Sequence, residues 1–226
     1  MFVLAIDTSN KILSVAIAQD KKVLVELNEE TKNNHSARLM PVVEKAFFKA
    51  GITPQQLDLI AVAQGPGSYT GVRIGVTVAK TLAWTLNKPL VGVSSLEVLA
   101  RNLSLDGVIA PLFDARRQTV FGGAYHKGYQ PLIPDGHYNL ADFLGKLPPG
   151  PVHFLGDAEA FRDEIIQKLG PDAYFYPEKN APHATELAFA AQLQPPIGHV
   201  HGFAPKYHRM PEAEVNWLLE QGAGNV

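Results

Sequence analysis

Hydrophobic residues in the first half of the chain follow two spacings, one of strand length and one of helical period. Short apolar runs at 2–6, 12–18 and 22–26 are separated by polar turns, which predicts an antiparallel meander. A helical spacing then covers 36–50, and Gly51 follows as a stop. The further predicted elements are a strand at 57–63, a helix at 72–86, a strand at 90–93 and a helix at 95–102.

The second half begins with the same order of elements. An apolar run at 108–113 ends in Asp114, a polar turn follows, and a second run returns at 119–125, so FDARRQTVFGGAY matches IDTSNKILSVAIA near the start. We therefore expect two lobes of related architecture, residues 1–102 and residues 103–226.

The rest of the second lobe carries weaker signals. Residues 127–151 are rich in proline and glycine, so we interpret them as an insertion or long loop with one short helical piece at 140–147. The other predicted elements are a strand at 152–155 and helices at 158–169, 185–193 and 213–220.

Composition narrows the class of protein. A chain of 226 residues that is 46% hydrophobic and 19% charged is long enough to bury a core and should be globular. With a net charge of -2 the chain has no basic field, so by itself it is a poor candidate for binding nucleic acid. The absence of cysteine excludes disulfides and thiolate chemistry. With no readable secretory signal and no run of membrane-spanning length, we expect a cytoplasmic protein without membrane contacts.

The stretch QGPGSYTG, between the predicted strand and helix at 57–63 and 72–86, is the first candidate for ligand binding. A glycine turn there can direct backbone N–H groups and the positive end of a helix at an anion, which indicates a phosphate site. It lacks the lysine and the following serine or threonine of a P-loop. A glycine turn between a strand and a helix can also be a packing device, and both interpretations stay open.

Other candidates for catalysis or metal binding have stronger structural alternatives. His199 and His201 would share a face of a strand, with His208 nearby, but the segment is rich in proline and glycine, so we interpret them as solvated. Ser68 lacks the glycine two residues later that a nucleophile elbow requires. Arg73 lies where a helix dipole does not favour a cation, so we expect it to have an acidic or carbonyl partner. We predict no catalytic residue and no metal site.

The order of elements resembles the two-lobed actin-like ATPase (ribonuclease H-like) fold, an α/β architecture in which each lobe is a mixed β-sheet with flanking helices. The motifs QGPGSYTGVRIG, IDTSNKILSVAIA and PKYHRMPEAE are similar to those of the TsaB family, also called YeaZ, and the similarity covers essentially the whole chain. This resemblance implies a role in forming N6-threonylcarbamoyladenosine in tRNAs that read codons beginning with A.

The resemblance also implies partners. Members of the family form a heterodimer with the transferase TsaD and activate it together with the ATPase TsaE, contact tRNA only through that complex, and form a homodimer when alone. TsaD carries the active site and two metal-binding histidines four residues apart, whereas here Leu39 stands four residues after His35. We expect a non-catalytic subunit with no firmly bound cofactor, and ADP or ATP only at a subunit junction.

Actin-like ATPases place a metal-orienting acid where Asp7 stands and usually follow it with a glycine. The turn Asp7-Thr8-Ser9-Asn10 has no glycine, which makes close approach of its backbone to phosphate harder. Asp114 is likewise followed by no glycine, so hydrogen-bonded turns are favoured over catalytic aspartates. The candidate positions for nucleotide contact are Asp7, Thr8, Gly65, Gly67 and Ser68.

The two helices that flank the glycine stretch carry more apolar residues than one buried face needs, with Met40 and Phe48 outside the main stripe. Such a surplus indicates either a partner surface or a layer covered by the chain itself. The resemblance favours a partner, because it implies that these helices bind TsaD and also bind a second copy of the chain. The expected interface residues, with Val76 taken to face outward, are Leu39, Met40, Val43, Phe47, Arg73, Val76, Ala79, Lys80 and Ala83.

An enzyme that acts on its own is the competing hypothesis, either an ATP-dependent phosphotransferase or a metallopeptidase of the same fold. A nucleotide-binding regulatory module is a third. Turnover of ATP or peptide by the isolated chain would favour an enzyme, and conversion of a homodimer into a heterodimer with TsaD would favour the subunit.

Overall fold

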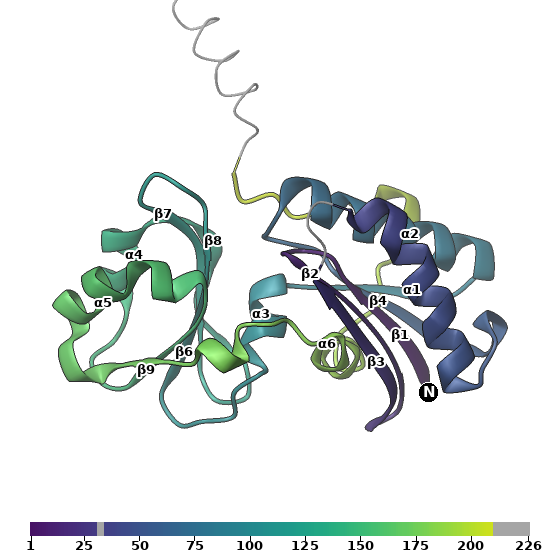
Figure 1. The fold of residues 1–226 in the computed structure, drawn as a ribbon, viewed down its shortest axis with the longest axis horizontal. Coiled ribbons are helices and arrows are strands. Elements are labelled where there is room, and N and C mark those ends of the chain that lie inside the picture. Colours follow the sequence, from purple (N-terminus) through teal and green to yellow (C-terminus); the bar gives the residue numbers. More distant parts are fainter. Residues whose placement is uncertain (31–33, 210–226) are drawn as a thin grey trace, which may run out of the picture.

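The computed structural model describes residues 1–30 and 34–209, which form two lobes, each built on a five-stranded mixed sheet (Figure 1). The first sheet has the order β3-β2-β1-β4-β5, in which β1, β2 and β3 form the predicted antiparallel meander and β4 and β5 run parallel to β1. Its strands are β1 (Phe2–Asp7), β2 (Ile12–Gln19), β3 (Lys22–Glu30), β4 (Leu59–Ala63) and β5 (Leu90–Val93).

The second sheet repeats this topology. Its order is β10-β9-β6-β7-β8, with an antiparallel meander of β6, β7 and β8 and with β9 and β10 parallel to β6. The internal repeat predicted from the order of elements is therefore confirmed. The strands are β6 (Val108–Asp114), β7 (Thr119–Tyr125), β8 (Pro131–Asn139), β9 (Val152–Gly156) and β10 (Ala173–Phe175).

Helices cover both faces of the first sheet. Alternate residues of a strand point to opposite faces, so Leu4 and Ile6 of β1 pack under α1 and α2, while Val3 and Ala5 pack against α6. On α6 the buried side chains are mostly alanines, which bring the helix close to the sheet. The α-helices are α1 (His35–Ala50), α2 (Tyr69–Leu86), α3 (Ser95–Ala100), α4 (Leu140–Lys146), α5 (Arg162–Leu169) and α6 (Ala184–Ala191).

Short 3-10 turns complete the described chain, and among the described helices none is long and apolar enough to cross a membrane. The helix predicted at 213–220 lies outside the described residues. The 3-10 turns are η1 (Pro54–Gln56), η2 (Asp157–Phe161), η3 (Gly170–Asp172), η4 (Pro177–Lys179) and η5 (Val200–Gly202).

The predicted boundary after residue 102 separates the two sheets but not the helices. α3 precedes the boundary, yet its side chains Leu96 and Leu99 belong to a cluster with Ile109 and Phe113 of the second sheet. α6 follows the boundary but packs on the first sheet, on the face turned toward the second lobe (Figure 1). Each lobe is thus completed by a helix from the other half of the chain.

The prediction of a long loop at 127–151 is wrong for the part that forms β8, whereas the short helical piece predicted at 140–147 is confirmed as α4. This segment forms β8, an edge strand that pairs only with β7, followed by α4. Proline removes a backbone donor and is tolerated at a sheet edge, so Pro131 and Pro134 obscured the strand signal without preventing the strand. β10 was also missed, because a strand of three residues shows no periodic pattern.

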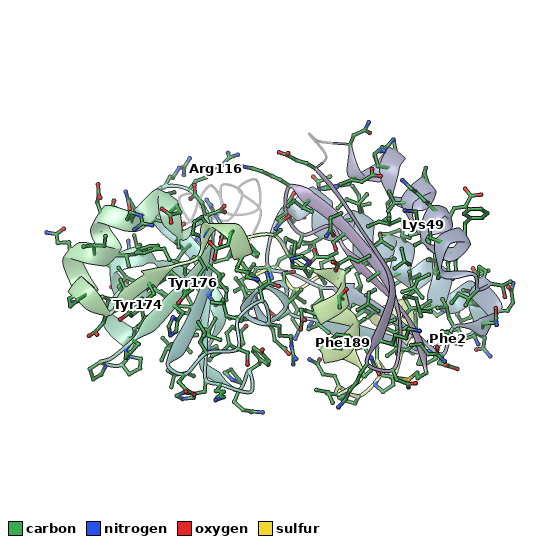
Figure 2. All side chains as sticks on the ribbon, turned by 60° about the horizontal axis from the view of Figure 1, so that its bottom comes forward. Phe2, Lys49, Arg116, Tyr174, Tyr176 and Phe189 are labelled. Carbon is green, nitrogen blue, oxygen red and sulfur yellow. The ribbon has the colours of Figure 1, made fainter. Side chains whose placement is uncertain are left out.

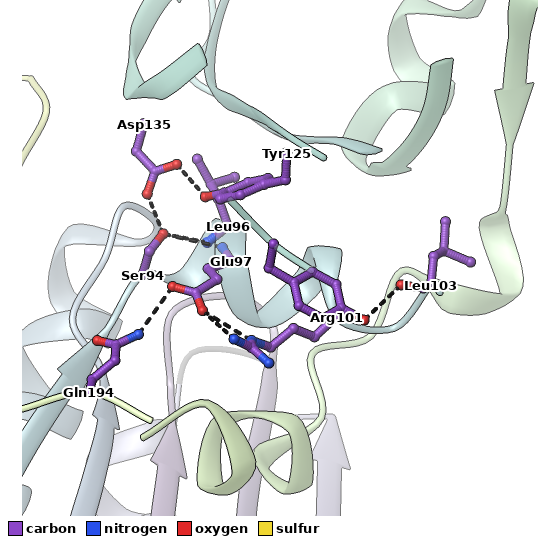
Figure 3. A network of polar contacts seen from close by, with 9 residues as sticks. Ser94, Leu96, Glu97, Arg101, Leu103, Tyr125, Asp135 and Gln194 are labelled. Carbon is purple, nitrogen blue, oxygen red and sulfur yellow. Dashed lines mark hydrogen bonds and ion pairs between the residues drawn. The ribbon is translucent and has the colours of Figure 1, made fainter. Parts of the chain in front are cut away.

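A polar network joins the lobes where α3 begins (Figure 3). Ser94 caps α3 by accepting hydrogen bonds from the backbone N–H groups of Leu96 and Glu97 at 3.1 and 3.2 Å, and its own hydroxyl donates to Asp135 of β8. The hydroxyl of Tyr125 donates to the other oxygen of the same carboxylate. Burial, with the neighbouring charge of Asp135, raises the pKa of Tyr125, so its hydroxyl stays protonated and donates.

Candidate functional site

The glycine stretch forms a turn between β4 and α2, as predicted. α2 begins at Tyr69, earlier than the predicted residue 72, because Ser68 caps it by accepting a hydrogen bond from the N–H of Gly71 at 3.2 Å. Gly65 has a φ of +102°, a backbone conformation that residues other than glycine rarely adopt. Its N–H donates to the Ser95 hydroxyl at 3.1 Å. The sequence therefore located this turn correctly.

The turn at residues 7–10 packs directly against the glycine turn. The N–H of Ser68 donates to the carbonyl oxygen of Ser9 at 2.7 Å, and the Thr8 hydroxyl donates to the carbonyl oxygen of Gly71 at 2.7 Å. A Cβ atom at Gly67 would lie 2.3 Å from the Ser9 oxygen, and one at Gly71 would lie 2.2 Å from the Thr8 oxygen. The glycines therefore admit the chain's own turn.

Asp7 is fully buried beside this contact. Its Oδ1 atom accepts a hydrogen bond from the N–H of Ser9 at 2.8 Å, while within the described residues its Oδ2 atom has no hydrogen-bond partner. Burial raises the pKa of Asp7, although the hydrogen bonds from Ser9 oppose the rise. A carboxyl group without access to solvent is poorly placed to orient a metal or a nucleotide, so the hydrogen-bonded-turn interpretation is the better supported one.

A cleft of about 440 Å³ lies between the lobes, beside the glycine turn. One wall comes from the start of α2 and the loop before it, and the other from the turn between β6 and β7 together with Phe121. The segment 206–209 borders the cleft as well. Of the nucleotide candidates only Gly67 lines this cleft; Asp7 and Thr8 are buried, and Gly65 is buried against the backbone of Lys206.

The partner expected for Arg73 proved to be different. Its Nε–H donates to the Tyr207 hydroxyl at 2.6 Å, and Nη2 donates to the Tyr69 hydroxyl. The guanidinium also lies over the Tyr69 ring, 4.0 Å from its centroid. Arg73 therefore ties the start of α2 to the C-terminal segment through phenol oxygens, rather than through an acid or a carbonyl group.

Lys80 makes a second tie to that C-terminal segment. Its Nζ donates to the carbonyl oxygens of Phe203 at 2.6 Å and His201 at 2.9 Å. The His201 ring packs on Trp84 with 4.1 Å between centroids, and His199 accepts a hydrogen bond from the N–H of Gly202 at 3.2 Å. Within the described residues no three side chains of the metal-binding types come together.

The structure separates the expected interface residues into buried and exposed ones. The expectation that Val76 faces outward is wrong, because it is 2% exposed and packs in the core under α2. The outward apolar side chains are instead Phe48, which is 87% exposed, Met40 and Trp84. Surplus apolar spacing had indicated Met40 and Phe48, but the sequence could not show which stripe meets the sheet. The expected interface residues that are buried in the first-lobe core are Leu39, Val43, Phe47, Val76, Ala79 and Ala83.

Sequence reasoning assigned no role to the cleft residues of the C-terminal segment. Lys206, Tyr207 and Arg209 lie in the motif PKYHRMPEAE, whose only signal was family resemblance. The N–H of Lys206 donates to the Gln64 carbonyl at 2.8 Å, and Arg209 Nη1 donates to the carbonyl oxygen of Ala115 at 2.9 Å. These long-range bonds place the segment along the cleft, and no local pattern predicts them.

A family model and a curated relative both match this chain over most of its length. Residues 23–222 match the family model "TsaD: tRNA N6-adenosine threonylcarbamoyltransferase". The chain is 43% identical to the tRNA threonylcarbamoyladenosine biosynthesis protein TsaB of Bacillus subtilis, over 98% of this chain and 100% of that protein.

Solved structures show the same fold. A Pseudomonas aeruginosa protein described as similar to peptidase YEAZ superposes with a TM-score of 0.75 at 26% identity, over 92% of this chain and 99% of the other. The ethanolamine utilization protein EutJ of Carboxydothermus hydrogenoformans shares the fold alone, with a TM-score of 0.50 at 12% identity, over 84% of this chain and 90% of that one. The predicted two-lobed actin-like fold is confirmed.

Proposed function

The chain belongs to the TsaB family, which acts in the biosynthesis of tRNA threonylcarbamoyladenosine, and we propose that within this pathway it is a non-catalytic subunit. In this role it binds and activates a TsaD-like transferase, together with a TsaE-like ATPase, for modification of tRNAs that read codons beginning with A. It forms a homodimer when alone and works in the cytoplasm. Any ADP or ATP lies at a subunit junction.

The observation that carries this proposal is the set of exposed apolar side chains on α1 and α2. Met40 and Phe48 are eight residues apart and share one side of α1, while Trp84 is exposed near the end of the neighbouring α2. Complete burial of one such side chain contributes about 2 kcal/mol. We define the partner surface as Met40, Phe48 and Trp84, which revises the expected set.

The closed glycine turn supports the non-catalytic part of the proposal. The N–H of Ser68 bonds to Ser9, the carbonyl oxygen of Gly71 accepts from Thr8, and Asp7 has no exposed surface. Catalytic groups stabilise developing charge only where the substrate can reach them. Release of phosphate from ATP by the isolated chain, lost in Asp7→Ala, would contradict this part.

The test of the partner surface is Phe48→Glu. We expect the homodimer and the heterodimer with a TsaD-like transferase to dissociate in analytical ultracentrifugation, because a carboxylate would be buried at the contact. The thermal midpoint should stay near that of the original chain, since Phe48 is 87% exposed.

The matched control is Ile166→Glu, which introduces the same charge at an exposed apolar position on α5 of the second lobe. It should leave both assemblies intact. Val76→Glu, in contrast, should unfold the chain. If the heterodimer persists in a Phe48→Glu, Trp84→Glu double variant that remains folded, the partner surface is assigned wrongly.

A further inference from the structure

The cleft between the lobes concentrates positive charge in a chain whose net charge is -2. Four always-charged cations line it, from both the second lobe and the C-terminal segment: Arg116, Arg117, Lys206 and Arg209. Asp114 is the carboxylate among the described lining residues, and its Oδ1 atom accepts a hydrogen bond from the N–H of Arg116 at 2.7 Å. Burial lowers the pKa of His208, so His208 adds little charge near neutral pH.

The turn that carries two of these cations has an uncommon backbone. Arg116, Arg117 and Gln118 have φ values of 67°, 53° and 59°, although none of them is a glycine or an asparagine. Residues with side chains seldom adopt this region, and strained positions gather at functional sites. Asparagine or glycine would suit the turn better, so arginine at residue 116 points to a use for its side chain. Figure 2 shows Arg116 at the side of the second lobe that is turned toward the first.

Aromatic rings lie beside the cations. Tyr207 stacks on Tyr69 with 4.5 Å between ring centroids, and both line the cleft while remaining more than a third exposed. Arg73 holds the two hydroxyl groups, as described above, so the rings are fixed in place. Fixed, exposed rings next to a cationic groove are the features on which single-stranded nucleic acids bind, through base stacking and phosphate contacts.

We propose that this cleft binds an RNA strand, with phosphodiester groups against Arg116 and Lys206 and a base on Tyr207, because Arg73 and Tyr207 already lie against the Tyr69 ring. The proposal rests on the proposed function, since it makes the chain a direct contributor to tRNA binding rather than a subunit that meets tRNA only through its partner. A compact nucleoside polyphosphate fits less well. Its phosphates would need the backbone at 67–71, where Ser9 already accepts the Ser68 N–H and the Ser9 and Thr8 carbonyl oxygens lie close against Gly67 and Gly71.

The experiment measures binding of a fluorescent single-stranded RNA and of a tRNA to the full chain by anisotropy, across a salt series. The test variant is Arg116→Asn with Lys206→Gln. Asparagine tolerates the left-handed backbone, and within the described residues neither side chain makes an ion pair, so the fold should be retained. The control, Lys21→Gln with Lys168→Gln, removes the same charge from exposed positions outside the cleft.

We expect the test variant to bind roughly tenfold more weakly near 0.15 M salt, and its salt slope to fall by about 1.4, because about 0.7 counterions are released per phosphate contact on a single strand. The control should bind like the original chain. The cleft assignment is overturned if the original chain binds neither RNA, if the control weakens binding as much, or if excess ADP displaces the RNA.

Failure of this inference is distinguishable from failure of the proposed function. Stimulation of a TsaD-like transferase by a chain that binds no RNA would overturn the cleft alone. RNA binding that depends on Arg116 and Lys206, by a chain that neither binds nor stimulates the transferase, would overturn the proposed function alone. Both readouts use the full chain.

Discussion

Gly71→Ala tests whether the glycine turn is closed by the chain itself. The new Cβ atom would lie 2.2 Å from the carbonyl oxygen of Thr8. Thr8 is buried, and its side chain donates a hydrogen bond to the carbonyl oxygen of Gly71. Overpacking of this kind costs about 1–3 kcal/mol, and a contact with fixed backbone belongs at the upper end. Alanine recovers up to about 1 kcal/mol of helix propensity. The net expectation is a loss of about 2 kcal/mol in the free energy of unfolding.

The assay is urea unfolding followed by fluorescence, with a thermal scan beside it. For a chain of this size the loss should lower the thermal midpoint by about 4–8 °C. Gly145→Ala is the matched control, because Gly145 is also helical but a Cβ atom there would meet nothing within 4 Å. It should raise stability by about 0.5 kcal/mol. If Gly71→Ala is neutral or stabilising, the turn is not closed by packing, and the argument against a phosphate site loses its basis.

Two further predictions concern contacts between distant elements. Hydrogen bonding to Glu26 raises the pKa of His183, and despite burial the bonds from His183 and Thr185 lower the pKa of Glu26. The pair should therefore stabilise the fold most between about pH 4.5 and 6.5, because Glu26 becomes protonated below this window and His183 loses its proton above it. The free energy of unfolding of His183→Asn should differ most from that of the original chain in this window. A difference that does not change with pH would contradict this prediction. Asp135→Asn leaves the buried Tyr125 hydroxyl badly paired and should cost about 1–3 kcal/mol in urea unfolding, whereas Tyr125→Phe, which removes the donor, should cost about 1 kcal/mol. A smaller loss in Asp135→Asn than in Tyr125→Phe would refute the network.

The local patterns along the chain predicted most of the fold. Runs of strand length and helical spacings located β1 to β7, β9 and α1 to α6, and Gly51 ended α1 as expected, with a φ of +67°. Each of these elements has an apolar run or a helical spacing bounded by turn residues, so its own residues specify it. β8 was missed because its prolines are acceptable only at a sheet edge, and a strand becomes an edge through its neighbours.

The candidate site was located by sequence but interpreted incompletely. The glycines at 65, 67 and 71 were recognised as a turn, yet two explanations for them stood side by side. The contacts of Thr8 and Ser9 favour packing, and they join residues about sixty positions apart. In the same way, α2 has apolar residues on more than one face. Only the position of the sheet decides that the face with Val76 is buried and that Trp84 is exposed.

What the sequence determined by itself is the order of the elements other than β8 and β10, the internal repeat and the family, because each depends on local spacing or on contiguous motifs. What only the tertiary structure decided is which surfaces are free. Three features depend on residues far apart in the chain: the packing of residues 7–10 against the glycine turn, the exchange of α3 and α6 between lobes, and the cationic cleft. Such contacts arise when the lobes pack together, and a pattern read along one segment cannot specify the segment that comes to lie against it.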